Sequence, residues 1–215
     1  MIGLGSFTGD AQIGIDRASV TAVFEGNDAV GIGSLSGQAL IRSSGTLDVT
    51  VNSERATGLG SMSGTGEILL EGGSVSITVH CDAGACIGTF SGEIVTCISN
   101  ARVHIHGEGN RVSGFGSTDG ACDTRIESGT ISGLIYAGDR MMLGNEHSRM
   151  IITGGNVLLS PDQPQAPVSP GGLPLTRRTP AEDHFEAACK DRRESWTYVA
   201  DRDEDGQLSV WLPEP

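Results

Sequence analysis

The chain has 215 residues and a net charge of −13, and this acidity disfavours binding to nucleic acid or to an anionic membrane surface, both of which attract Lys and Arg. Aromatic residues make up only 4% of the chain, so its core must consist of small and β-branched side chains. No apolar run approaches the roughly 18 residues of a membrane span and no secretion leader is visible, so we expect a fragment or a mature chain.

The chain is organised around a Gly-rich motif, AVGIGS at residues 29–34, that returns at a nearly constant interval. The apolar centres of its copies, 27 or 28 residues apart, are Leu4, Ile32, Leu59, Ile87, Phe115 and Leu143. A fixed period of this length through most of a chain is the signature of a solenoid, whose repeats stack on one another.

Each repeat contains three apolar patches separated by turns rich in Gly, Ser and Asn, and the third patch is the Gly-rich motif itself. In the second patch, Leu47, Val49 and Val51 alternate with polar residues, which is typical of a strand. Short strands of this kind also build β-sandwiches, but identical three-part repeats favour parallel stacking. The sequence therefore predicts an all-β, right-handed parallel β-helix over residues 1–160, with about six coils of about 28 residues and three faces per coil.

The motif copies also predict the chemistry of one corner of the coil. The two glycines beside each apolar centre suit a corner that needs positive φ or a close approach of two backbones. A ladder of small polar residues closes the copies, and we expect these side chains to hydrogen-bond to nearby backbone: Ser6, Ser34, Ser61, Thr89, Ser117 and Asn145.

The five cysteines are irregularly spaced and lack the paired C-x-x-C arrangement of a zinc site. Cys81 and Cys86 are close enough in sequence to close a small disulfide loop. The favoured interpretation is that the cysteines are small thiols that are buried or have no chemical role.

The composition changes after the repeats. Residues 161–180 hold six of the eight prolines and predict a linker or an extended strap. A capping box of Thr179 and Glu182 then predicts a short helix that ends near Arg193.

Residues 181–215 form the last predicted unit, in which this helix is followed by a β-hairpin of residues 195–200 and 206–212. The connection of the hairpin matches the first half of a calcium loop through three carboxylates, Asp201, Asp203 and Asp205. The twelfth position of such a loop is Leu212 here, and Asp-Gly is also a common hairpin turn. The turn is therefore the favoured interpretation, so the sequence predicts no cofactor, with calcium as the alternative at this loop.

Polar side chains on the outer face of the second strands form the most prominent candidate site. The repeat register places four of these residues in one row along the solenoid, Asn52, His80, Glu108 and Tyr136. His104 and His106 lie beside this row. Neighbours on such a face lie roughly 5–7 Å apart, and a polar shelf with an aromatic edge suits the hydroxyl groups of a glycan. Two alternatives stay open: a divalent metal held by His and Glu, and a solvated strand face without a ligand.

A second patch of charged residues lies on the first strands and contains Glu67, Glu71, Asp123, Arg125 and Glu127. Paired carboxylates on a β-helix are typical of polysaccharide hydrolases, which use them as acid and base. Because Arg125 lies between Asp123 and Glu127, the sequence favours a salt-bridged surface instead. The turns are also too short to build a catalytic cleft, so we expect no enzymatic activity.

The AVGIGS motif and the strand pattern SGTxxVxV resemble the Gly-rich AGIG-type repeats of large surface and carbohydrate-binding proteins of gut Gram-positive bacteria. The closing stretch WTYVADRDEDGQLSVWLPEP is similar to C-terminal hairpins of such proteins. The resemblance covers residues 1–160 and the tail, and it carries over no site residues. It implies an extracellular or cell-surface module that acts in adhesion or glycan binding. A polysaccharide lyase or hydrolase and a purely structural spacer remain the alternatives.

The first motif copy, Ile2–Ser6, has no earlier coil against which to pack. Because an uncovered β-helix end is prone to pairing with other strands, we expect upstream sequence or a partner to cover it.

Overall fold

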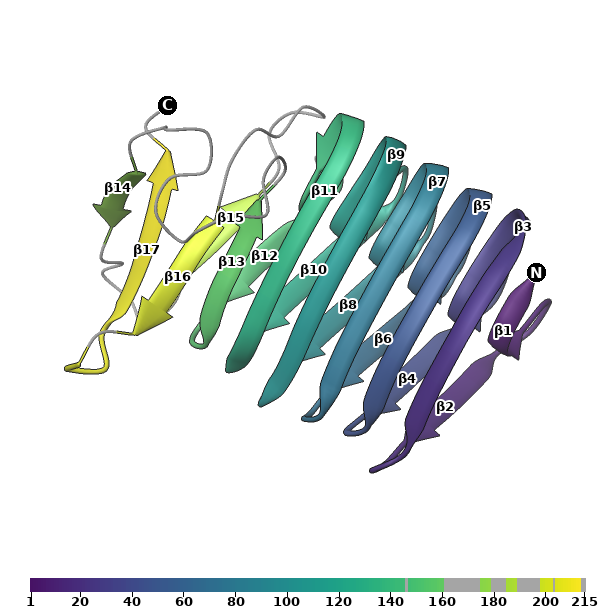
Figure 1. Ribbon diagram of the computed structural model, residues 1–215, viewed down its shortest axis with the longest axis horizontal. Helices are drawn as coiled ribbons and strands as arrows, with labels where there is room; N and C mark the ends of the chain where they lie inside the picture. The colour runs from purple at the N-terminus through teal and green to yellow at the C-terminus, as the bar shows by residue number, and fades with distance from the viewer. Residues whose placement is uncertain (146, 161–174, 179–184, 189–197, 203, 214–215) are drawn as a thin grey trace.

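The computed structural model describes residues 1–145, 147–160, 175–178, 185–188, 198–202 and 204–213. These residues form β-strands and loops, and no helix occurs among them. The strands stack along one axis as a β-solenoid, with the N terminus at one end and the last strands at the other (Figure 1).

Each coil supplies one long strand to a front sheet and one short strand to a back sheet, and successive coils pair in parallel. The coil strands of the front sheet are β1 (Ile2–Ser6), β3 (Ser19–Ser34), β5 (Thr46–Ser61), β7 (Ser74–Thr89), β9 (Ala101–Ser117), β11 (Gly129–Met141) and β13 (Asn156–Ser160). Those of the back sheet are β2 (Ala11–Ile15), β4 (Ala39–Ser43), β6 (Thr65–Leu70), β8 (Glu93–Ile98), β10 (Ala121–Ile126) and β12 (Arg149–Ile152). The pairing offset equals the sequence repeat, since Ile32 pairs with Leu59 and Leu59 with Ile87. The predicted parallel β-helix is confirmed.

The chain runs upward along the front sheet in Figure 1, returns downward along the back sheet and advances from right to left. This sense of rotation is right-handed, as expected from the handedness of parallel connections. The core fills the space between the sheets, where Ile41, Val49 and Ile77 are each at most 2% exposed.

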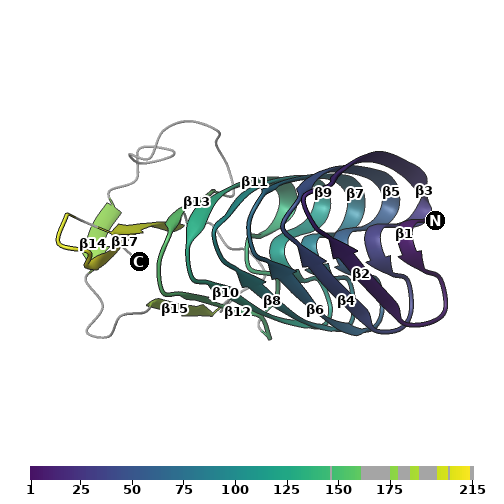
Figure 2. The same cartoon turned by 90° about the horizontal axis from the view of Figure 1, so that it is seen from below.

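The three apolar patches of a repeat form two sheets rather than three faces, which corrects the expected cross-section. The second and third patches run as one long, bent strand, so that β3 and β5 each span 16 residues. The last six residues of these two strands are buried on both faces. Figure 2 shows the ends of the long strands curling inward between the two sheets. The Gly-rich motif is therefore an inner layer and not a third outer wall.

Two glycines per motif permit this inner layer. A Cβ atom on Gly31 would lie 2.6 Å from Cγ1 of Val49, so a side chain there would collide with the front sheet. Gly33 and Gly60 have φ angles of 140° and 137°, which residues with a side chain rarely adopt. The first glycine thus serves close approach and the second serves the bend, as the sequence predicts.

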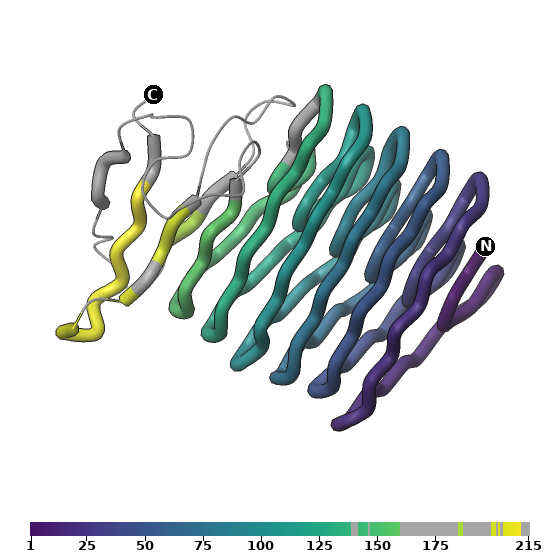
Figure 3. Tube along the Cα trace, in the orientation of Figure 1, coloured from purple at the N-terminus to yellow at the C-terminus, as the bar shows by residue number. Residues whose placement is uncertain are grey.

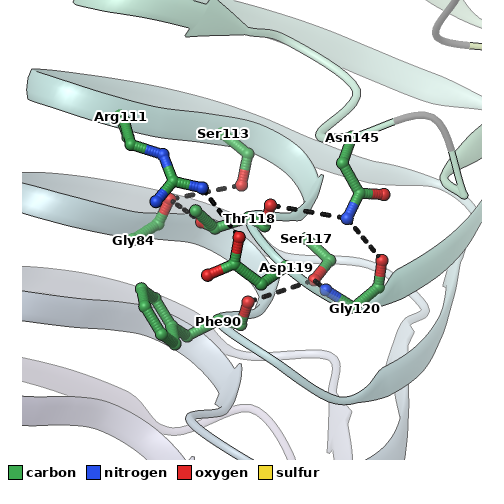
Figure 4. A network of polar contacts seen from close by, with 9 residues as sticks. All are labelled: Gly84, Phe90, Arg111, Ser113, Ser117, Thr118, Asp119, Gly120 and Asn145. Atoms are coloured by element: carbon green, nitrogen blue, oxygen red, sulfur yellow. Dashed lines mark hydrogen bonds and ion pairs between the residues drawn. The ribbon is translucent and has the colours of Figure 1, made fainter. Parts of the chain in front are cut away.

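Members of the predicted ladder make the expected bonds to local backbone (Figure 4). The Ser117 hydroxyl donates to the carbonyl oxygen of Phe90 at 3.3 Å and accepts from the amide of Gly120 at 2.6 Å. The side-chain amide of Asn145 donates to the carbonyl oxygen of Gly120 at 2.7 Å. These bonds hold the end of the inner layer to the loop of the preceding coil and to the loop that follows it.

That loop folds back over the motif. The Thr118 hydroxyl donates to the carbonyl oxygen of Gly84, a residue of the preceding coil, at 3.1 Å (Figure 4). The cover leaves the hydroxyls of Ser61 and Thr89 buried and without a hydrogen-bond partner in the described part of the chain. The ladder prediction thus holds at some rungs and not at these two.

Antiparallel strands cover the C-terminal end of the solenoid. β16 (Tyr198–Arg202) pairs with β13 and extends the front sheet through β17 (Leu208–Pro213) and β14 (Leu175–Arg178). The pairing of β16 with β17 confirms the predicted hairpin. On the back sheet, β15 (Phe185–Ala188) pairs with β12.

The predicted helix is wrong where it can be compared, because Phe185–Ala188 is a strand. The open edge of β12 offers these residues a row of backbone partners, and Arg149 adds an ion pair with Glu186 at 3.7 Å. The remaining residues of the predicted helix and residues 161–174 of the predicted linker lie outside the described residues.

Candidate functional site

Along each strand of the front sheet, side chains that face the core alternate with side chains that point outward. Val75, Ile77 and Val79 of β7 are each at most 1% exposed. Because successive side chains of a strand point to opposite faces, Ser76, Thr78 and His80 lie on the outer face. The same alternation in β5, β9 and β11 produces rows of outward side chains that run along the solenoid.

One row contains four of the predicted site residues in consecutive coils. Asn52 pairs with His80, His80 with Glu108, and Glu108 with Tyr136. Paired strands lie about 4.8 Å apart, so the row repeats at that interval. Nδ1 of His80 lies 3.1 Å from Oε2 of Glu108, and their side chains are 44% and 60% exposed. We call this set, together with His104 and His106, the histidine face.

A cluster of three aromatic rings lies across two rows of the histidine face. The ring centroid of His106 is 6.0 Å from that of His80 and 5.8 Å from that of Tyr136, with an edge-on arrangement in the second pair. Leu134 follows His106 in its row and is only 9% exposed. The polar surface of this row therefore ends at Leu134, whereas the neighbouring row continues to Tyr136.

His104 lies in a third row and has a partner that the sequence analysis left out of the site. Its Nδ1 is 3.0 Å from the Ser132 hydroxyl, which is also 3.4 Å from the carbonyl oxygen of Val103. The register alone identifies this pair, since Ser132 follows His104 by 28 residues. Ser132 therefore belongs to the candidate site.

The pKa of His106 is lowered from its ordinary value, chiefly by partial burial and then by the neighbouring His80, while Glu108 opposes the shift. A neutral imidazole has one donor and one acceptor nitrogen. Near neutral pH the ring of His106 therefore offers both kinds of hydrogen-bonding group.

A metal ion finds little support in the geometry. No group of three or more His, Cys, Asp and Glu side chains within the described ranges is arranged to hold one. Of the calcium candidates, Asp201 lies in β16 and Asp205 in the turn, while Asp203 lies outside the described residues. Gly206 has a φ of 77°, which suits the hairpin turn that the sequence favours.

The charged patch on the back sheet pairs differently from the expectation. Asp123 accepts two hydrogen bonds from Arg149 at 2.9 and 3.0 Å, rather than pairing with Arg125, and Glu71 pairs with Arg42. Glu67 is two strands away from Asp123 in the register, with Val95 between them. An open depression crosses this region of the back sheet. Of the carboxylates that line it, Asp123 is paired with Arg149.

Four of the cysteines lie in the described part of the chain as free thiols, of which Cys81, Cys86 and Cys122 are buried and Cys97 is half-buried. Burial raises the pKa of the Cys81 thiol to about 12 and that of Cys122 to about 11, and it places that of Cys86 well above the ordinary value. Such thiols are poor nucleophiles because the reactive thiolate is scarce.

No protein-family model, curated protein or solved structure gives a significant match to the chain. Over the described residues, no helix is long and apolar enough to cross a membrane. The interpretation of the histidine face therefore depends on its own geometry.

Proposed function

We propose that the chain is a non-catalytic, extracellular surface module that binds glycan on the histidine face. The observation that carries the proposal is the in-register row of Asn52, His80, Glu108 and Tyr136, which places an amide, an imidazole, a carboxylate and a phenol side by side. The location at a cell surface follows from the resemblance to surface proteins with Gly-rich repeats.

The chemistry of the row suits sugars. A carboxylate accepts hydrogen bonds from hydroxyl groups, and an amide or a neutral imidazole both donates and accepts them. The C–H face of a pyranose packs on aromatic rings. The rings of His106 and Tyr136, whose centroids are 5.8 Å apart, are available for that contact. Because the histidine face is an open polar surface on a sheet, it suits an extended polysaccharide better than a single sugar, which is usually held in a deep pocket.

The alternative activity, a polysaccharide lyase or hydrolase on the back sheet, has weaker support. Its acid and base would be Glu67 and Asp123, and Asp123 is held by Arg149 through two hydrogen bonds. A carboxylate whose two oxygens both accept hydrogen bonds from Arg149 is poorly placed to contact a glycosidic oxygen. The second alternative, a structural spacer, requires no ligand on either the front or the back sheet.

A glycan array that compares the chain with the variant His104→Ala/His106→Ala tests the proposal. Gln12→Ala serves as the control, because Gln12 is exposed on β2 at the far side of the solenoid. We expect the wild type and the control to bind the same glycans, and the double variant to lose at least about tenfold in affinity. Each sample is also measured with EDTA and with calcium, and we expect neither to change binding.

The same samples separate the alternatives. A soluble sugar product released from a polysaccharide panel would replace the binding proposal by the enzyme. Binding that the double variant retains would move the site away from the histidine face. Absence of binding in every arm would leave the spacer.

A further inference from the structure

An arginine without a partner lies beside the histidine face. Arg102 precedes His104 by two residues on β9, so both side chains point to the outer side of the front sheet. Arg102 is exposed, and within the described residues its guanidinium forms no ion pair and no hydrogen bond. Figure 3 shows β9, in teal, between its neighbours β7 and β11 inside the front sheet. The position of Arg102 therefore does not depend on either end of the chain.

Four other arginines of the described coils are each paired with a carboxylate. The pairs are Arg42–Glu71, Arg55–Asp28, Arg111–Asp119 and Arg149–Asp123. The chain has 27 acidic residues and only 14 Lys and Arg, so carboxylates that could pair with an arginine are in excess. A guanidinium that stays unpaired in such a chain is available to an anion from outside.

The immediate neighbours of Arg102 on the outer face carry hydroxyl groups. Arg102 pairs with Ser74 of β7 on one side and with Thr130 of β11 on the other. The carboxylates of the front sheet lie further away. Asp48 is on β5, two strands from β9, and Glu108 is six residues further along β9, or roughly 20 Å. Arg102 thus combines a free guanidinium with a hydroxyl group on each side.

We propose that the glycan bound by the histidine face is acidic, and that a carboxylate of one of its sugars binds to Arg102. This inference rests on the proposed glycan binding and names the class of the glycan. A guanidinium donates two parallel hydrogen bonds to a carboxylate, and the hydroxyls of Ser74 and Thr130 supply further donors. The rest of the glycan extends along β9 to His106, over roughly 13 Å.

The charge of the protein restricts the ligand to a glycan with few acidic sugars. The chain has a net charge of −13, and Glu108 lies at the other end of the same line of side chains on β9. A second carboxylate at that end would meet a like charge, which disfavours binding. The ligand is therefore a largely neutral glycan with an isolated acidic sugar, either a uronic acid or a terminal sialic acid, and not a polyanion.

Pairs of glycans that differ only in the acidic sugar test this proposal. One pair is sialyllactose and lactose, and the other is a xylan oligosaccharide with and without a single glucuronic acid. We expect the wild type to bind the acidic member of at least one pair at least about tenfold more tightly than its neutral partner. The pair that shows this preference distinguishes sialic acid from uronic acid. A wild type that binds both members equally, or prefers the neutral ones, would overturn the acidic class and leave glycan binding intact.

Arg102→Gln tests the assigned residue and should abolish the preference while binding to the neutral glycans remains. Arg125→Gln is the matched control, because Arg125 is exposed on β10 of the back sheet and also has no ion pair within the described residues. This control removes the same charge and should keep the preference. Circular dichroism confirms that both variants are folded. A preference that survives Arg102→Gln, or that both variants lose, would contradict the role of Arg102.

Oligogalacturonate, which carries a carboxylate on every sugar, tests the restriction on charge. It should bind less tightly than the preferred glycan with a single acid, and the reverse order would contradict the repulsion by Glu108. Absence of binding to every glycan would overturn the proposed function and this inference together. That result differs from the loss of the acidic preference alone.

Discussion

Gly60 shows how strictly single residues constrain this coil. Its φ is 137°, and an added Cβ would overlap the carbonyl oxygen of Gly88 in the next coil. Gly60→Ala should therefore lower the free energy of unfolding by roughly 3 kcal/mol or more, from backbone strain and from displacement of a neighbouring strand. Urea unfolding followed by circular dichroism measures the loss.

Gly14→Ala is the matched control for this change. Gly14 lies on the outer side of β2 with nothing within 4 Å of an added Cβ, and its φ is not positive. We expect a change within about 0.5 kcal/mol. Equal losses in the two variants would show that the positive φ of the motif is not the source of the constraint.

The pKa of His106 should respond to substitution of its charged neighbours. Since burial and His80 lower its pKa while Glu108 raises it, Glu108→Gln should lower the pKa further and His80→Ala should raise it. Asn52→Ala, which lies in the row of His80 and Glu108 but removes no charge, should leave the pKa of His106 unchanged. Imidazole resonances followed by NMR against pH give these values directly, and a shift of the wrong sign in either variant would contradict the assigned causes.

The sign of the stability effect follows from the same shift. The folded-state pKa of His106 lies below the ordinary value of about 6.5, so the unfolded chain takes up this proton more readily. The neutral ring of His106 is therefore compatible with the folded state, and the free energy of unfolding is not reduced by this group above pH 6.5. The free energy of unfolding decreases as the pH falls from 6.5 through the folded-state pKa of His106.

At this scale the repeat register predicts which side chains become neighbours, but not how they bond. The 28-residue offset correctly places His80 beside Glu108. It misses the partner of Asp123, because the pairing of β10 with β12 has an offset of 26 residues and brings Arg149 directly beside Asp123. The local change of offset thus decides the ion pair.

Among the elements, the C-terminal cap offers a test of how the end of the solenoid is protected. Val210 in β17 is fully buried, and its strand continues the sheet between β16 and β14. Val210→Asp places an unpaired charge in that core and should cost roughly 3 kcal/mol or more. Hydrogen exchange should show faster exchange in β13 and β16, while β5 and β7 keep their protection. Stability in a solenoid is largely local, which is the reason for this difference.

Gln12→Asp adds the same charge at an exposed position of β2 and should change stability by less than about 0.5 kcal/mol. If Val210→Asp instead accelerates exchange equally in all coils, the cap is not a separate unit.

Two elements escape prediction from the sequence for different physical reasons. Thr179, Pro180 and Glu182 are genuine local signals for a helix, but a short helix is only marginally stable by itself, and Phe185–Ala188 pairs antiparallel with the edge of β12 instead. The inner layer leaves a signal that alternation alone does not reveal. Residues 29–34 contain no charge, as is typical of a strand buried on both faces.

For the molecule as a whole, the equal coils mean that one repeat is removable as a unit. Ser61 pairs with Thr89, and both are followed by equivalent loops, so deletion of residues 62–89 joins two matching points. The shortened chain should fold into a solenoid with one coil fewer and with a free energy of unfolding lower by a few kcal/mol, since one coil and one interface between coils are lost. Circular dichroism and thermal unfolding measure both effects.

The site provides an independent readout of this deletion. β9 then pairs with β5, which places Asn52 beside Glu108 and removes His80 altogether. The pKa of His106 should rise, because His80 no longer opposes its protonation. Deletion of residues 62–75 is the control, since it removes a back strand without its front strand and leaves the chain no parallel return path. That variant should not fold. A folded half-coil deletion, or an unfolded full-coil deletion, would contradict the view that the 28-residue coil is the unit of this structure.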